Sequence, residues 1–376
     1  MLTLIKNVDV YAPAHLGVND ILVSFQKILK IGKNIDIGNL EANIYDFEGC
    51  AATPGLVDAH VHILGGGGEK GFCSRTEEIK AATLLKAGIT TVVGLLGTDG
   101  YTRTMPNLLA KCKSLNEEGL TAYCMTGNYS LPVRTMTEDV ESDLIFINEI
   151  LGVGEIALSD HRSSHPSVKD IIQLVSSVRV ASMIAGKAGV VNFHIGDEKT
   201  ALSQLIQLLE ETDIPSKHLL PTHINRSADL LNNGIDYSKK YCAPIDFTTS
   251  RDNITPLKDK LNPYNCLEKC LSEGVDIENI TYSSDGQGSL PVFDEKGCIT
   301  GYGVGQVASM WENVESSVKI NGRCLSEALL PATVNPARIY GMKDKGHLRE
   351  GKDADIIIAD ANLKIKSVFA LGCKIF

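Results

Sequence analysis

The sequence predicts an α/β fold, a (β/α)8 TIM-like barrel with a small β-sandwich domain built from both ends of the chain. Short apolar strands alternate with helical stretches eight times between residues 55 and 336. Residues 1–54 and 337–376 instead contain short strand-like runs that turn signals separate. At 376 residues the chain also exceeds the usual size of one hydrophobic core, which favours a large domain plus a smaller one.

The predicted small domain, residues 1–54 plus 337–376, consists of short antiparallel strands. Its strand-like runs are Leu2–Val10, Ile21–Ile31, Ile44–Phe47, Ala354–Ala359 and Ile365–Phe376. Turn signals at residues 32–34 and 38–39 separate the first three runs. The chain would therefore leave this domain after residue 54 and re-enter it after the barrel.

The predicted barrel domain, residues 55–336, contains eight strands. These strands are Gly55–His62, Ile89–Leu96, Thr121–Tyr129, Gly154–Ser159, Val190–Ile195, Leu219–Ile224, Ile245–Thr249 and Ile280–Ser284. The helical stretches between them include Arg75–Ala87, Met105–Gly119, Val168–Ala185, Thr200–Glu211, Asn265–Glu273 and Gly305–Val318. A doubly wound sheet is the alternative, but no GxGxxG motif follows a strand in this sequence. The alternation therefore favours the barrel.

Polar residues end many of the predicted strands, and in such barrels the active site lies at the carboxyl ends of the strands. His60 and His62 end the first strand, where side chains two residues apart point to the same side. The other polar residues at or near strand ends are Tyr129, Glu155, Asp160, Arg162, His194, His223, Arg226 and Asp285. The five remaining histidines are expected to be surface or structural residues, and they are His15, His161, His165, His218 and His347.

Four histidines and two carboxylates form a candidate set of six metal ligands: His60, His62, Glu155, His194, His223 and Asp285. An HxH pair alone is more often incidental than functional. Several histidines that converge on one barrel mouth from separate strands favour a metal site. Imidazole and carboxylate suit two divalent metals per subunit, with zinc the leading candidate. Paired metals would share a bridging hydroxide and act as Lewis acids on a carbonyl.

The bulk composition argues against several classes of partner. A formal charge of −10 disfavours nucleic acid and anionic membranes, because both require a basic face. No apolar run reaches the length of a membrane span, and the start MLTLIKNVDVY lacks the features of a signal peptide. Ten scattered cysteines without a CxxC pair favour reduced thiols. The sequence therefore predicts a cytoplasmic protein whose main partner is neither nucleic acid nor an anionic membrane.

Several motifs resemble the amidohydrolase superfamily: PGLVDAHVH, the single histidines ending strands five and six, and SSD at strand eight. The stretch NPARIYGMKDKGHLREGKDADIIIAD looks like the passage by which these enzymes return to their small β domain. Within the superfamily the chain resembles the isoaspartyl (β-aspartyl) dipeptidases, a family of metallopeptidases. The diagnostic stretches are HILGGGGEKG, GTDG, NYSLPVRTMT, ALSDHRSS, FHIGDEK, THINR and SSDGQGS. This resemblance runs essentially from end to end.

The resemblance implies zinc-dependent hydrolysis of β-aspartyl dipeptides by a metal-bound hydroxide, which would clear isoaspartyl peptides left by protein degradation. Five residues match the family's metal ligands: His60, His62, His194, His223 and Asp285. Asp285 also matches the acid/base group that takes a proton from the hydroxide and delivers it to the leaving amine. Tyr129 matches the phenol that helps to polarise the scissile carbonyl.

Substrate-binding residues also follow from the resemblance. Glu69 resembles the residue that binds the α-ammonium of the substrate, supported by Gly67, Thr98 and Ser289. Arg162 and Arg226 resemble the arginines that bind carboxylates, for which a planar fork is better suited than lysine. The resemblance further implies a homo-oligomer, with an octamer as the expected size.

Glu155 departs from the family pattern, because many members place a carboxylated lysine there that bridges both metals. Glutamate supplies a carboxylate without carbon dioxide, but its side chain is shorter by roughly 3–4 Å. Either the fourth strand approaches the metals more closely, or one metal binds tightly and the other weakly. We favour the first alternative, a metal pair bridged by Glu155.

Two alternative functions remain at this stage. One is another amide or cyclic-amide hydrolase of the superfamily, such as an N-acyl-amino-acid deacylase or a dihydroorotase-like enzyme. Glu69 argues against it, since those substrates carry no free α-ammonium. The other is a non-catalytic relative that has lost its metals, which the intact set of histidines and Asp285 disfavours.

Overall fold

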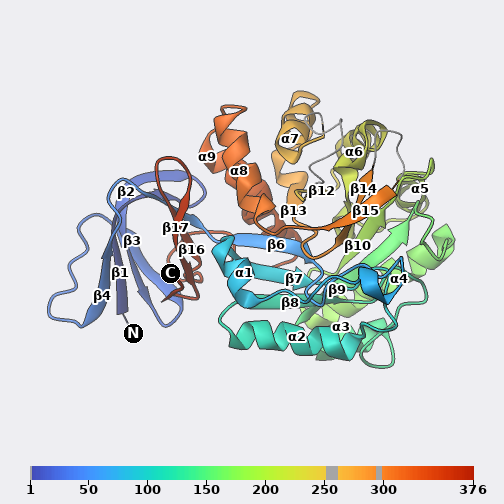
Figure 1. The fold of residues 1–376 in the computed structure, drawn as a ribbon, viewed down its shortest axis with the longest axis horizontal. Helices are drawn as coiled ribbons and strands as arrows, with labels where there is room; N and C mark the ends of the chain where they lie inside the picture. The colour runs from blue at the N-terminus through green and yellow to red at the C-terminus, as the bar shows by residue number, and fades with distance from the viewer. Residues whose placement is uncertain (1, 251–260, 294–298) are drawn as a thin grey trace.

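Eight parallel strands form a barrel beside a small β domain in the computed structural model, which describes residues 2–250, 261–293 and 299–376 (Figure 1). The barrel strands are β6 (Leu56–Val61), β7 (Ile89–Gly94), β8 (Thr121–Thr126), β9 (Ile150–Leu158), β10 (Val190–Ile195), β11 (Leu219–Thr222), β12 (Ile245–Thr248) and β13 (Ile280–Ser283). Each corresponds to a predicted strand, so the predicted fold class is confirmed. The largest difference is at β9, which begins four residues before the predicted Gly154 because its first half is buried as completely as its second.

The barrel closes where its last strand meets its first. Strands β6 to β11 pair in chain order as one parallel sheet, and β12 pairs with β13. Just after β13, the backbone N–H of Asp285 donates to the carbonyl of His60 at 3.1 Å, and that of His62 donates to Gly286 at 2.9 Å. This closure places Asp285 directly beside the two histidines of the first strand.

Helices surround the barrel sheet, and buried apolar side chains fill the layer between helices and strands. The α-helices are α1 (Ala81–Lys86), α2 (Met105–Glu117), α3 (Val140–Phe146), α4 (Val168–Ala185), α5 (Ser203–Glu211), α6 (Ala228–Tyr241), α7 (Pro263–Ser272), α8 (Ser309–Lys319), α9 (Leu325–Leu329) and α10 (Val334–Ile339). Helix α4 has the predicted bounds, because Ser167 and Asp170 form a capping box and Gly186 ends the helix in a left-handed conformation.

Three helices begin later than predicted. Helix α1 starts at Ala81 rather than Arg75, since Arg75 and Thr76 instead pair with the glycine-rich stretch after β6. Helix α8 starts at Ser309 because Gly305 exchanges backbone hydrogen bonds with residues 287 and 288. Helix α5 starts at Ser203 rather than Thr200. In the first two cases, contacts with distant residues outweigh a local preference for helix.

The small domain is one sheet that draws strands from both ends of the chain. Its strands are β1 (Leu2–Tyr11), β2 (His15–Ser24), β3 (Lys27–Gly32), β4 (Ala42–Asp46), β5 (Ala51–Pro54), β16 (Ile356–Ala359), β17 (Ile365–Ala370) and β18 (Cys373–Lys374). Ile5, Val8, Ile356 and Phe369 are buried in a common core. The exact domain boundaries, 1–54 plus 337–376 and 55–336, stay a prediction.

Two details of this sheet correct the sequence analysis. The predicted run Ile21–Ile31 is two strands, because Phe25 and Gln26 adopt positive φ angles of 46° and 71° in a tight hairpin turn. The strands are also not all antiparallel, since β4 and β5 both run parallel to β1. The chain crosses back over β1–β3 once, between β3 and β4, and then continues from β4 into β5 along the same edge of β1. The direction of pairing therefore depends on this crossover and not on the local sequence.

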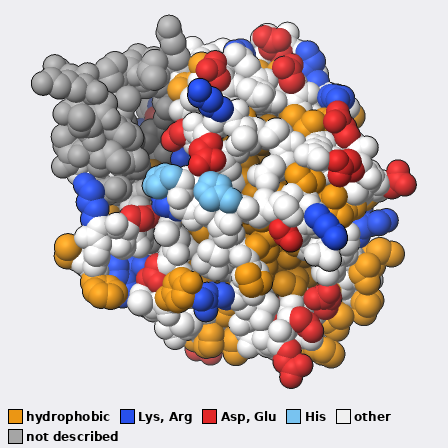
Figure 2. Space-filling view, turned by 90° about the vertical axis from the view of Figure 1, so that its right-hand side faces the viewer, with side chains coloured by type: hydrophobic (Ala, Val, Ile, Leu, Met, Phe, Trp, Pro, Cys, Tyr) orange, Lys and Arg blue, Asp and Glu red, His pale blue; other side chains and the backbone are white. Residues whose placement is uncertain are grey.

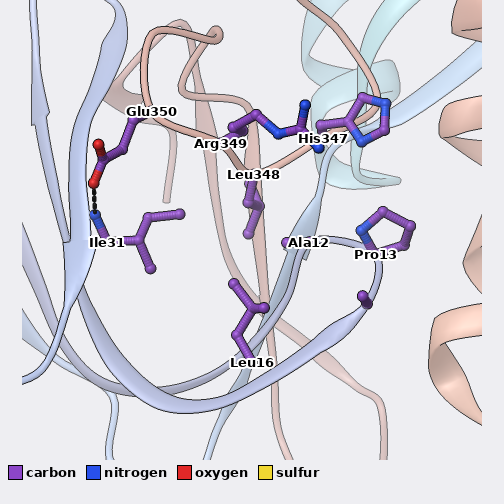
Figure 3. Close-up of a pocket in the computed structure, with 9 residues that line it drawn as sticks. Ala12, Pro13, Leu16, Ile31, His347, Leu348, Arg349 and Glu350 are labelled. Atoms are coloured by element: carbon purple, nitrogen blue, oxygen red, sulfur yellow. Dashed lines mark hydrogen bonds between the residues drawn. The ribbon is translucent and has the colours of Figure 1, made fainter.

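A cavity of about 400 Å³ lies in the small domain, between the β1–β2 turn and the segment before β16 (Figure 3). Its lining is mostly apolar and comprises Ala12, Pro13, Ala14, Leu16, Ile31, His347, Leu348, Arg349 and Glu350. The Glu350 carboxylate accepts a hydrogen bond from the N–H of Ile31 at 3.2 Å, so it is engaged with the sheet edge. None of these residues lies at a strand end of the barrel.

The surface carries charges of both signs. Figure 2, viewed from the right-hand side of Figure 1, shows Lys and Arg mixed with Asp and Glu, with hydrophobic side chains between them. Helices α3 and α4 contribute exposed apolar residues, namely Phe146, Val180, Met183 and Ile184. Among the described residues, no helix combines the length and apolar character needed to cross a bilayer.

Lys345 joins the small domain to the barrel. Its ammonium is buried and lies 2.7 Å from Asp355 Oδ2, 2.9 Å from Asp353 Oδ2 and 2.5 Å from the Thr121 hydroxyl at the start of β8. We expect Lys345→Met to lower the free energy of unfolding by about 3–5 kcal/mol, because it leaves Asp355 buried without its cation. Urea denaturation measures this loss. Lys240→Met removes an exposed ion pair with Glu210 and should cost far less stability, so equal losses would contradict this role.

Candidate metal centre and active site

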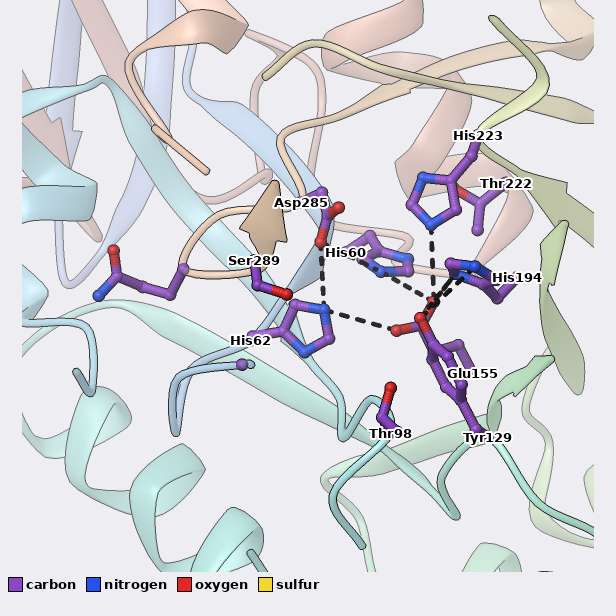
Figure 4. A network of polar contacts seen from close by, with 12 residues as sticks. His60, His62, Thr98, Tyr129, Glu155, His194, Thr222, His223, Asp285 and Ser289 are labelled. Carbon is purple, nitrogen blue, oxygen red and sulfur yellow. Dashed lines mark hydrogen bonds and ion pairs between the residues drawn. The ribbon is translucent and has the colours of Figure 1, made fainter. Parts of the chain in front are cut away.

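Four histidines and two carboxylates meet at the carboxyl ends of the barrel strands (Figure 4). His60 lies in β6 and His62 directly follows it, Glu155 lies in β9, and His194 lies in β10. His223 and Asp285 come just after β11 and β13, in left-handed backbone conformations with φ of 66° and 51°. All six side chains are buried. Strands far apart in the sequence therefore deliver the predicted ligand set to one place.

The carboxylate of Glu155 lies at the centre of this cluster. Its Oε2 atom is 3.4 Å from His60 Nε2, 3.1 Å from His194 Nδ1 and 3.6 Å from His223 Nε2. Its Oε1 atom faces the other way, 3.4 Å from His62 Nε2. One oxygen of the carboxylate thus faces His62, and the other faces His60, His194 and His223.

Glu155 reaches the histidines despite being shorter than a carboxylated lysine. Part of the reason is that β9 packs closely on β10. A Cβ atom at Gly152 would lie 2.0 Å from the carbonyl oxygen of Val190, so only glycine allows this approach. The choice between the two alternatives from the sequence, a close approach of this strand to the metals or one tight and one weak metal, stays a prediction.

The donor set fits metal ions. Potential ligand atoms form two groups, and within each group all atoms lie within 4.8 Å of one another. One group is His60, His62 and Asp285, and the other is His60, Glu155 and His223. Several of these atoms are buried without a hydrogen-bond partner, namely His60 Nδ1 and Nε2, His62 Nδ1, Glu155 Oε1 and Asp285 Oδ1. Buried polar atoms are rarely left unpaired, and a bound cation would satisfy Nε2 and the carboxylate oxygens.

The electrostatics keep both carboxylates charged. Burial alone would raise the pKa of Glu155, but the charge of His60 and hydrogen bonds from His194 and His223 hold it well below the usual value. Asp285 shows the same balance, and hydrogen bonding and charge from His62 lower its pKa. For His60, burial lowers the pKa but the charge of Glu155 outweighs it and raises the value to about 9. The cluster is therefore an anionic pocket suited to cations.

Tyr129 follows β8 and reaches into the same cluster. Its hydroxyl lies 2.9 Å from His194 Nδ1, and its ring centre is 5.1 Å from the guanidinium carbon of Arg162. Burial and the charge of Glu155 raise the pKa of Tyr129 well above its usual value. The phenol therefore keeps its proton and can donate a hydrogen bond.

Glu69 lies beside a ring of donors. Its Oε1 atom is 3.3 Å from the Thr98 hydroxyl and 3.3 Å from Arg162 Nη1, and its Oε2 atom is 3.3 Å from the Ser289 hydroxyl. Gly67 lies in the same loop as Glu69, in a left-handed conformation with φ of 72°. The structure thus brings together the residues predicted around Glu69 and adds Arg162 to them.

Arg162 and Arg226 both lie near His194. Nη2 of Arg162 is 3.3 Å from His194 Nε2, and Nη2 of Arg226 is 3.5 Å from the same atom. Arg226 also has its Nη1 atom 3.7 Å from Asp197 Oδ2. Two guanidinium groups therefore stand at the edge of the cluster, next to a candidate metal ligand.

Two site residues received no role from the sequence. Asp160 accepts two hydrogen bonds from the guanidinium of Arg162, at 2.9 and 2.8 Å, and its Oδ2 atom is 3.0 Å from His194 Nε2. Burial would raise the pKa of Asp160, but these contacts hold it far below the usual range. Thr248, at the end of β12, has its hydroxyl 2.5 Å from His223 Nδ1 and fixes that ring. Their positions at or just beyond strand ends were the available signal.

Comparisons with known proteins agree with this architecture. The model of the amidohydrolase family matches residues 51–374. The crystal structure of a β-aspartyl dipeptidase from Fervidobacterium islandicum AW-1, in complex with the β-Asp-Leu dipeptide, is 41% identical with a TM-score of 0.93, and covers 100% of this chain and 96% of that one.

More distant relatives have other activities. A dihydroorotase from Lactobacillus gasseri is 22% identical over 97% of this chain and 90% of that protein. An adenine deaminase from Clostridium perfringens is 23% identical over 99% of this chain, which spans 58% of that protein.

The central place of Glu155 leads to a prediction about metal content. Because each of its oxygens faces different histidines, we expect Glu155→Ala to bind fewer metal ions per subunit than the unchanged protein. Elemental analysis of purified protein after dialysis against zinc measures this number. Glu149→Ala, which removes a carboxylate paired with Lys113 outside the site, should leave the metal content intact. An unchanged stoichiometry in Glu155→Ala would exclude a bridging role.

Proposed function

The chain belongs to the amidohydrolase family, and on that premise we propose that it hydrolyses the isopeptide bond of β-aspartyl dipeptides. The observation that carries this proposal is the 3.3 Å pairing of Glu69 with Arg162 beside the buried histidines. The similarity to the β-aspartyl dipeptidase of F. islandicum, at 41% identity over the whole chain, supports it independently.

The charges near the site suit the aspartyl end of such a substrate. In a β-aspartyl dipeptide, an ammonium and a carboxylate are attached to the same α-carbon, so the two opposite charges lie side by side. Glu69 and Arg162 offer the complementary pair, and Thr98 and Ser289 hold the carboxylate of Glu69. Arg226 supplies a second guanidinium for a carboxylate. A cyclic amide such as a dihydroorotase substrate has no ammonium to pair with Glu69.

We propose that six residues hold two divalent metals, with zinc the leading candidate: His60, His62, Glu155, His194, His223 and Asp285. When bound, such ions polarise a carbonyl and lower the pKa of water. The orientation of Glu155, with one oxygen toward His62 and the other toward His194 and His223, supports its role as the bridging carboxylate.

Two residues complete the proposed chemistry. Asp285 is charged and its Oδ1 atom faces the cluster, so it can take a proton from the attacking water and deliver it to the leaving amine. Tyr129 keeps its proton, so its hydroxyl can donate a hydrogen bond to the oxygen of the scissile carbonyl as negative charge develops there. The reaction adds one water across the C–N bond and releases aspartate and the second amino acid.

The proposed biological role is the removal of isoaspartyl dipeptides formed during protein degradation. A cytoplasmic location and assembly into a homo-oligomer stay predictions.

The choice between β- and α-linked substrates tests the proposed function. We expect cleavage of β-Asp-Leu and at least about 100-fold lower kcat/KM for α-Asp-Leu, because the α-linked carbonyl lies one carbon nearer to the charged groups and is misplaced. Release of leucine measures both rates in protein loaded with zinc. Hydrolysis of dihydroorotate in place of β-Asp-Leu, or equal rates on the two dipeptides, would contradict the proposal.

Glu69 gives a second prediction. Glu69→Gln should lower kcat/KM for β-Asp-Leu by about 100-fold, because the α-ammonium loses its charged partner. N-succinyl-leucine differs from β-Asp-Leu only in lacking this ammonium, so its hydrolysis should not fall. Glu78→Gln, which changes an exposed carboxylate paired with Lys111, is the matched control and should resemble the unchanged protein on both substrates. Equal losses on both substrates in Glu69→Gln would exclude the assigned role.

A further inference from the structure

The loop that leads to Glu69 has almost no side chains with which to fix its own position. It runs from Leu64 to Gly68, and we call it the glycine loop. Gly65, Gly67 and Gly68 adopt positive φ angles of 77°, 72° and 109°. A Cβ atom at Gly65 would lie 2.3 Å from the carbonyl oxygen of Thr76, so the backbone itself packs against the facing segment. The position of this loop must therefore come from hydrogen bonds to its backbone.

Arg103, from a different part of the barrel, provides the side-chain hydrogen bonds to three carbonyls of this loop, while N–H groups of Gly65 and Gly66 donate to the carbonyls of His62 and Gln287. It lies between β7 and α2 and is only 4% exposed. Its Nε atom donates to the carbonyl of Leu64 at 3.0 Å, and its Nη2 atom donates to Gly66 at 2.9 Å. The fork also reaches Gly67 at 3.4 Å and Thr76 at 3.2 Å. One guanidinium thus binds three carbonyls of the glycine loop and one of the segment facing it.

The segment that carries Arg103 also contacts Glu69 itself. Thr98, five residues before Arg103, donates its hydroxyl to Glu69 Oε1 at 3.3 Å. Between them Asp99 shapes the turn, since it accepts from the N–H groups of Tyr101 at 3.1 Å and Thr102 at 2.8 Å. Asp99 Oδ2 also lies 3.5 Å from Arg103 Nη1. Residues 98–103 therefore hold both the backbone of the glycine loop and the carboxylate at its end.

We propose that Arg103 is a positioning residue that sets the specificity of the site by holding Glu69 in place through the glycine loop. The inference rests on the proposed function, because that function assigns the α-ammonium of the substrate to Glu69. The glycine loop is then a preformed part of the binding site, built on a buried cation. If Arg103 had a purely structural role, its loss would lower kcat/KM for every substrate alike. In the role proposed here, its loss affects only the substrates whose ammonium binds Glu69.

Kinetics on two substrates and hydrogen exchange test this role together. In Arg103→Met, we expect KM for β-Asp-Leu to rise about 10-fold or more, with a smaller change in kcat. N-succinyl-leucine, which has no ammonium for Glu69, should keep its kcat/KM. Amides in residues 64–76 should exchange faster, including that of Gly66, which donates to the carbonyl of Gln287 at 3.0 Å. Arg103→Lys should give intermediate values, since a single ammonium cannot reach all four carbonyls. This variant replaces Arg103→Met in the experiment if Arg103→Met does not fold.

Arg338→Met is the matched control, because Arg338 also donates to a backbone carbonyl, that of Glu278, away from the site. It should change neither the kinetic constants for the two substrates nor the rate of amide exchange in residues 64–76. Equal losses on both substrates in the Arg103 variants, or unchanged exchange in the glycine loop, would overturn the inference. Failure of the proposed function would give a different result. In that case Glu69→Gln would also leave the ratio of kcat/KM between β-Asp-Leu and N-succinyl-leucine unchanged. The exchange data alone would then decide whether Arg103 holds the loop.

Discussion

The carboxylate of Glu155 is the interaction on which the rest of the site depends. It lies within 3.1–3.6 Å of a nitrogen atom of all four clustered histidines, and every one of these groups is buried. A buried anion is costly unless cations or donors surround it. Two features of the fold provide this surrounding. Strand β9 packs closely on β10 at Gly152, and the barrel closes by joining the end of β13 to β6.

The site has two layers that share residues. The inner layer is the cluster of histidines around Glu155, and the outer layer is the pair of Glu69 and Arg162. Asp160 links them, because it accepts from the guanidinium of Arg162 and also lies 3.0 Å from His194 Nε2. Asp160 thereby fixes the position of the groups proposed to recognise the substrate relative to the groups proposed to hold the metals.

Much of the fold could be predicted because its signals are local. Each barrel strand is a short buried apolar run, and β10 has the predicted bounds, Val190–Ile195. Helix α4 also has the predicted bounds, since its capping box and its terminal glycine are encoded in adjacent residues. The errors occur where distant residues compete. Residues 75–76 pair with the glycine-rich stretch instead of starting α1, and β4 and β5 run parallel to β1 because the chain crosses back over the sheet between β3 and β4.

The sequence by itself determined the barrel and the strand-end places of the candidate ligands, because strand periodicity and the parallel order of the strands follow from local pattern. The family resemblance added Glu69 and the carboxylate-binding role of the two arginines. Only the tertiary structure decided that Glu155 reaches the histidines, because its reach depends on how closely two strands pack. The same holds for Arg103, Asp160 and Thr248. Their contacts with Leu64, His194 and His223 join residues that are 25 or more positions apart along the chain. Side chains whose role depends on such distant partners leave no periodic signal in the sequence.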